Sequence, residues 1–208
     1  MIFALLFATV LILIRTKMPE GVGDTAEWLR DQQGGIFTAT VMMPFAGISF
    51  LWFIGVVRDN LGRYEDRFFA TVFLGSGLLF LAMMFVATAV AAALVASNTG
   101  VTNSEAHIEV IDFGKMVVLS ATKTYALRMA AVFMISLATI WLKTGLMPRW
   151  LVGLSYLLAV AVLIVTDLSM WVTLAFPVWV LVVSALILAR SRSIEQLRAG
   201  SGAPTDNV

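Results

Sequence analysis

Residues 150–189 form an almost unbroken apolar run of forty residues, in which Asp167 is the only charged side chain. An α-helix rises about 1.5 Å per residue, and the hydrocarbon core of a bilayer is about 30 Å thick, so about 20 residues cross it. The run is twice as long as one crossing requires. It therefore predicts two membrane spans that fold back on each other near Asp167, and hence a multi-pass membrane protein.

The rest of the chain continues this pattern. Of its 208 residues, 60% are hydrophobic and only 13% are charged, and the mean hydropathy is +0.94. We predict an all-α fold, a single transmembrane bundle of about six helices, because lipid-exposed backbone must satisfy its hydrogen bonds internally. A partly disordered cytoplasmic tail is predicted over 190–208. The predicted spans cover residues 1–14, 36–57, 68–96, 125–142, 150–165 and 168–189.

The first predicted span, residues 1–14, is short for a crossing. Fourteen helical residues reach only about 21 Å. The segment has no basic n-region and no small-residue cleavage site soon after it, so a signal peptide fits poorly. We interpret it as a retained span that is tilted, lies in a thin region, or extends beyond Arg15.

The distribution of cations between the predicted spans indicates an orientation. One set of loops carries five: Arg15, Lys17, Arg30, Lys115 and Lys123. The opposite set carries eight: Arg58, Arg63, Arg67, Lys143, Arg149, Arg190, Arg192 and Arg198. The positive-inside rule places the second set and both termini in the cytoplasm of a plasma (inner) membrane protein, although Arg15 and Lys17 argue the other way.

Tryptophans near predicted span ends fit this scheme as interfacial anchors. Trp52, Trp141 and Trp150 fall near cytoplasmic ends and Trp171 near an outer end, whereas Trp179 falls mid-span and either packs inside or faces lipid. The outer segment 97–124 is too mixed for a span, and we interpret its later part as an interfacial helix or a partly re-entrant cap.

The first candidate site is an ion pair at the outer side of the bundle. Arg128 lies about one turn inside the fourth predicted span, and Asp167 lies at the turn between the last two. Charges at this depth are costly unless they pair or snorkel. We predict a structural salt bridge, with Tyr125 able to join it; a snorkelling arginine and a substrate or ion site are the alternatives.

The second candidate site is a cytoplasmic loop with three cations and three anions between residues 58 and 67. Carboxylates just before a helix are favoured by its free amides and its dipole, so a capped, internally paired turn is the main interpretation. A docking surface for a cytoplasmic partner is the alternative. The residues concerned are Arg58, Arg63, Glu65, Asp66 and Arg67.

The third candidate group is Glu105, His107 and Glu109. In an extended strand these alternate side chains would point the same way, as metal ligands do. In a helix, His107 would turn away from the other two. With Asp112 nearby, an outer-loop active site of a lipid-processing enzyme is a further hypothesis, but a solvated loop is favoured, and we predict no metal site.

Small and rigid residues also mark helix contacts. Gly75 and Gly77 would let another helix approach the third span closely. Pro44 and Pro177 are predicted to kink their helices.

The composition excludes several chemistries. The chain has no cysteine and a single histidine, His107. Disulfides, thiolate nucleophiles, Cys-based metal sites and bis-His haem ligation within one chain are therefore excluded. We predict no cofactor, and no long basic run suggests nucleic acid as a partner.

Three short motifs in the C-terminal half resemble a pattern in uncharacterised multi-pass membrane proteins of actinobacteria. They are Tyr125-Ala-Leu-Arg128-Met-Ala-Ala-Val, Met147-Pro148-Arg149-Trp150 and Phe176-Pro177-Val-Trp179. The resemblance implies a six-span bundle and no assigned activity, so no functional residue carries over.

These observations favour a non-enzymatic accessory, assembly or scaffold subunit of a membrane complex. Its partners would be the lipid bilayer and other membrane proteins or further copies of itself. No nucleophile and base are spaced for catalysis. The alternative is a small-solute or ion transporter or channel that uses Arg128 and Asp167 at its outer mouth.

Overall fold

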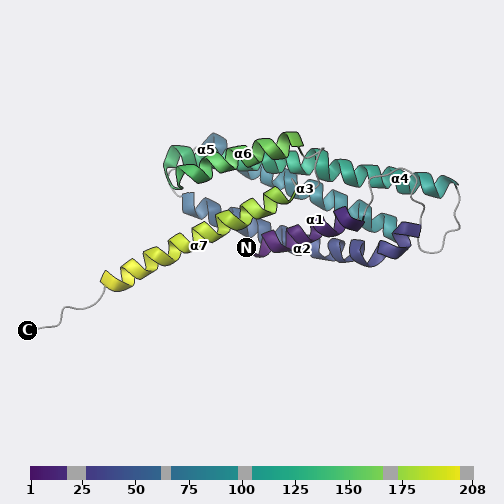
Figure 1. Ribbon diagram of the computed structural model, residues 1–208, viewed down its shortest axis with the longest axis horizontal. Helices are drawn as coiled ribbons and strands as arrows, with labels where there is room; N and C mark the ends of the chain where they lie inside the picture. Colours follow the sequence, from purple (N-terminus) through teal and green to yellow (C-terminus); the bar gives the residue numbers. More distant parts are fainter. Residues whose placement is uncertain (18–26, 62–66, 98–104, 166–172, 202–208) are drawn as a thin grey trace, which may run out of the picture.

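The structure is a computed structural model that describes residues 1–17, 27–61, 67–97, 105–165 and 173–201 (Figure 1). Within those ranges all regular secondary structure is helical, which confirms the predicted all-α class. Side chains are described over 1–14, 34–59, 68–97, 106, 108–164 and 173–189.

Six apolar helical segments make up the bundle. Three of them are long and apolar enough to cross a membrane, namely Gly34–Asp59, Phe68–Ser97 and Ile108–Thr144. Three are shorter, namely Ile2–Ile14, Arg149–Ile164 and Ala175–Ala189. This set of helices is that of a multi-pass helical membrane protein.

The longest element is one continuous helix from residue 105 to residue 144. It consists of α4 (Glu105–Leu119), a seven-residue π-helix, η2 (Ser120–Ala126), and α5 (Leu127–Thr144). The helix begins 20 residues before the span predicted at 125–142. The charges of Asp112, Lys115 and Lys123 interrupt the apolar pattern of this segment, so the sequence predicts an outer loop where the structure has a helix.

Helix α3 (Arg67–Ser97) pairs antiparallel with this long helix over most of its length. At one end the ammonium group of Lys143 lies 4.5 Å from the centre of the Phe69 ring. At the other end a Cβ atom on Gly114 would meet the Leu94 side chain, so this side chain packs directly on the α4 backbone there. Helix α3 matches the predicted span 68–96 to within one residue at each end.

Helix α2 (Glu27–Leu61) packs on the same α3 helix from another side. A Cβ on Gly77 of α3 would lie 3.0 Å from the Ile54 side chain and 3.1 Å from the Phe133 ring. Gly77 therefore lets α2 and α5 both approach α3, as the small-residue pattern predicted, whereas a Cβ on Gly75 would meet nothing within 4 Å. Pro44 lies inside α2.

Helices α6 (Arg149–Val165) and α7 (Ala175–Ser201) complete the bundle. The last helix begins at Ala175, after a short 3₁₀ turn at residues 173–174, rather than at 168. It continues to Ser201, so the predicted tail 190–208 is helical over its first twelve residues. Pro177 lies in the first turn of α7, where proline is tolerated without a kink, so the prediction of a mid-span kink is wrong at this position.

Helix α1 (Ile2–Lys17) and helix α7 meet near their first residues and extend in opposite directions, α1 toward the α4 end and α7 toward and beyond the α5–α6 end (Figure 1). The Phe3 and Phe176 ring centroids are 6.2 Å apart, and those of Phe7 and Phe176 are 6.1 Å apart. Each of these two helices therefore lines a different half of the bundle.

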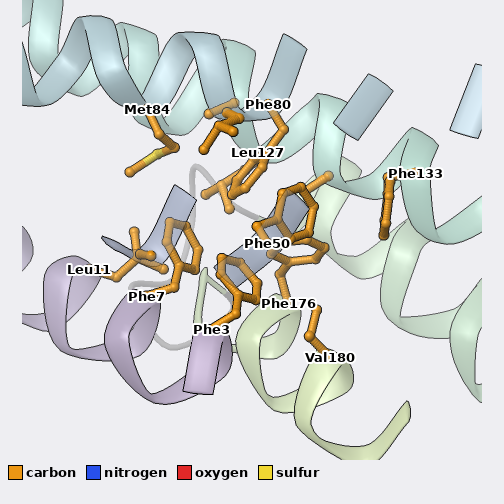
Figure 2. Packing of buried hydrophobic residues seen from close by; sticks show 14 of the residues in the cluster. Phe3, Phe7, Leu11, Phe50, Phe80, Met84, Leu127, Phe133, Phe176 and Val180 are labelled. Carbon is orange, nitrogen blue, oxygen red and sulfur yellow. The ribbon is translucent and has the colours of Figure 1, made fainter. Parts of the chain in front are cut away.

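Aromatic rings fill the region where the helices meet (Figure 2). Phe50 of α2 lies 4.6 Å from Phe3 and 5.3 Å from Phe80 of α3, measured between ring centroids. Phe133 of α5 stacks on Phe73 of α3 at 4.3 Å. We call the set the aromatic core: Phe3, Phe7, Phe50, Phe73, Phe80, Phe133, Phe176 and Trp179, all essentially buried.

Candidate functional site

Only one member of the predicted ion pair, Arg128, lies among the described residues. Arg128 is half-buried on α5, and its Nη1 donates a hydrogen bond to the backbone carbonyl of Thr124, 3.2 Å away. The Tyr125 side chain is largely exposed. Asp167 lies outside the described residues, so the Arg128–Asp167 salt bridge stays a prediction.

The cytoplasmic loop site is described at one edge. Arg58 is exposed in the last turn of α2, and α3 begins at Arg67. Arg63, Glu65 and Asp66 lie outside the described residues, and the Arg67 side chain is not described. Docking at this loop therefore also stays a prediction.

The backbone at the Glu105, His107 and Glu109 positions is helical. At about 100° per residue, positions 105 and 109 share a side of the helix, and position 107 lies about 200° away from 105. In this helical conformation the three positions do not share one side of the helix, as metal ligands would have to. Among the residues that the structure describes, no group of three His, Cys, Asp or Glu side chains is placed to hold a metal ion.

Two tryptophans expected near the membrane surface are exposed, Trp52 and Trp150. Trp141 is instead buried, with its ring centroid 6.1 Å from that of Trp179, so its prediction as an interfacial anchor is wrong. Trp179 packs inside: its Nε1 donates to the Ser155 hydroxyl of α6 at 2.8 Å. A buried tryptophan is favourable when its N–H has a hydrogen-bond partner, and Ser155 is that partner for Trp179. Trp171 lies outside the described residues.

The sequence pattern missed the position of Lys115. The sequence predicts this residue in a solvated outer loop, yet it lies on α4 with only 4% of its surface exposed. It shares its buried stripe with Ile111, Gly114 and Val118, which face α3. Spacings of three and four residues put these positions on one side of a helix. Only the recognition of α4 as a helix could have revealed this.

The opposite side of α4 carries exposed apolar side chains. Phe113 is 69% exposed and Met116 is 58% exposed, and Ile108 and Val110 are exposed with them. In a helix that lies against water, the cation would face outward and the aromatic ring inward. Helix α4 has the reverse arrangement, which makes this face a candidate contact surface.

The chain matches no protein-family model, no curated protein and no solved structure.

Proposed function

We propose that the protein is a non-enzymatic accessory, assembly or scaffold subunit of a membrane complex, which acts through the surfaces of its helices. The observation that carries this proposal is the aromatic core. Rings from α1, α2, α3, α5 and α7 interlock at the middle of the bundle and have no appreciable exposure. A centre packed with rings suits a rigid structural body.

The polar side chains of the long helices support the same proposal. Ser76 and Thr88 on α3 donate to carbonyls of their own helix, four residues back, at 2.7 and 3.0 Å. Thr122 and Ser136 on the long helix do the same at 2.8 Å. A hydroxyl satisfied in this way is not directed at a passing solute.

A small-solute or ion conduit along the bundle axis fits these observations less well. An ion crossing the middle of the bundle would have to displace Phe50, Phe133 and their neighbours from close ring contacts. A pathway needs polar groups or water to replace hydration. Arg128 and Asp167 are the residues such a conduit would use, and they are its natural test positions.

We propose a multi-pass bundle of six apolar helices with the α2–α3 and α5–α6 connections at the cytoplasmic face of a plasma (inner) membrane. At that end the described helices present exposed Arg58, Lys143 and Arg149. At the other end α4 presents exposed Glu109. An excess of cations on one end is what the positive-inside rule expects of the cytoplasmic side.

The proposal is tested in two parts on the full chain. Extraction in mild detergent followed by mass determination is expected to give a complex with a stoichiometric foreign membrane protein. An unrelated membrane protein of similar size and expression level serves as the control for casual co-purification. Reconstituted vesicles are expected to show no ion or solute flux above empty vesicles. A monomer or self-oligomer that conducts, with flux lost in Asp167→Asn, would overturn the proposal.

A further inference from the structure

The long helix that contains α4 exceeds a bilayer crossing. Its candidate span Ile108–Thr144 has 37 residues, or about 55 Å of helix. Even at a tilt of about 40°, it would extend about 42 Å along the membrane normal, against about 30 Å of hydrocarbon. Part of the helix must therefore lie outside the acyl chains.

The charges of the helix indicate which end lies outside. Between Met129 and Leu142, α5 has no charged residue, and it packs against α3 and α6. Helix α4 has exposed Glu109 and half-buried Asp112, and among the described helices it packs chiefly on α3. Exposed carboxylates are costly among acyl chains, so α4 is the end that leaves them.

The packing of α4 on α3 determines which side of α4 points outward. Gly114 meets the Leu94 side chain of α3, and Ile111, Lys115 and Val118 are buried on the same side of α4. At about 100° per residue, positions 113 and 116 lie on the other side of the helix. Phe113 and Met116 are accordingly exposed.

The exposed side of α4 combines apolar and acidic side chains. Glu109 precedes Phe113 by four residues, and Asp112 precedes Met116 by four, so each acid lies beside an apolar neighbour on the helix surface. We call this surface the outer α4 face: Ile108, Glu109, Val110, Asp112, Phe113 and Met116.

We propose that the outer α4 face binds an amphipathic helix of another membrane protein, with an apolar stripe against Phe113 and Met116 and Lys or Arg side chains beside Glu109 and Asp112. Apolar surface that lies outside the acyl chains is stabilised when another protein covers it. The carboxylates favour a partner with basic side chains beside its apolar stripe. A symmetric contact with a second copy would bring like charges together. This inference deepens the proposed function and rests on it.

The absence of native cysteine makes the first test direct. Phe113→Cys and, as control, Phe45→Cys, at an exposed position within the span Gly34–Asp59, are labelled with a fluorophore in phosphatidylcholine vesicles. We expect aqueous iodide to quench the label at 113 and chain-brominated lipid to quench the label at 45. Equal quenching of both labels by brominated lipid would show that lipid covers α4 and overturn the proposal. Disulfide formation between two Phe113→Cys chains would also overturn it, because a second copy would then be the occupant.

The second test uses two synthetic helical peptides with one leucine stripe, flanked by lysines in one and by glutamates in the other. The lysine peptide is expected to shield the label at 113, but not at 45, and to bind about fivefold more tightly than the glutamate peptide, as two exposed charge pairs would give. The double variant Glu109→Gln/Asp112→Asn should abolish that difference. Equal affinities for the unsubstituted protein would overturn the proposal. Flux through the vesicles would contradict the proposed function without changing the preference for the lysine peptide. Failure of the proposed function and failure of the docking proposal are therefore distinguishable.

Discussion

Two serine hydroxyls that are shielded from solvent have opposite environments and should respond oppositely to their removal. Ser155 accepts a hydrogen bond from Trp179 Nε1 at 2.8 Å, whereas Ser184 Oγ is buried with no partner among the described residues. Ser155→Ala leaves the indole N–H unsatisfied and should destabilise the fold by about 1–3 kcal/mol. Ser184→Ala removes an unsatisfied group and should be neutral or stabilising by about 1 kcal/mol. Thermal unfolding in one detergent compares them, and equal losses would contradict this account of the two sites.

Gly75 and Gly77 provide a second matched pair on one helix. A Cβ at Gly77 would lie 3.0–3.1 Å from Ile54 and Phe133, while one at Gly75 would meet nothing within 4 Å. We expect Gly77→Ala to cost about 1–3 kcal/mol through overpacking. Gly75→Ala should gain about 0.5–1 kcal/mol, because alanine loses less backbone freedom on folding. Midpoints of thermal unfolding measure both, and a Gly77→Ala protein as stable as the parent would refute the close packing.

At the scale of elements, η2 acts as a one-residue insertion in a long helix. Deleting exposed Ser120 should convert the segment to α-helix and keep the orientation of α4, because i→i+4 turns need one residue fewer for the same rotation. The label at Phe113→Cys should stay accessible to iodide. Deleting Ile135 inside α5 is the control, since the helix there has no extra residue to lose and should rotate by about 100°. Loss of iodide quenching at 113 after the Ser120 deletion would contradict this account.

At the scale of the whole molecule, the charge distribution predicts sidedness. Ala106 is exposed on α4 and Asp59 is exposed at the end of α2. We expect a membrane-impermeant maleimide to label Ala106→Cys in intact cells and Asp59→Cys only after the membrane is opened, because the cation-rich end faces the cytoplasm. Both single-cysteine proteins are compared in denatured samples for total reactivity. The reverse labelling pattern would invert the proposed topology.

The sequence alone determined that the protein is an all-helical bundle of long apolar segments. A lipid-exposed backbone has few ways to satisfy its hydrogen bonds, so apolar runs such as 68–96 have only one regular outcome. Both ends of the last helix were less predictable, since α7 begins seven residues later than expected and continues to Ser201. Flanking polar residues fix a membrane boundary and leave the helix end undetermined.

Only the tertiary structure decided which side of each helix is inside. Helices that are apolar on every side have little amphipathic signal, so neither the burial of Trp141 nor the gathering of Phe50 and Phe133 in one core could be read from spacing. Lys115 is a charged residue whose burial the sequence also could not predict. Its charge suggested water, but the packing of α4 on α3 buries it and leaves Phe113 exposed. Sequence periodicity reports the repeat of one helix, whereas burial depends on the neighbouring helices that cover it.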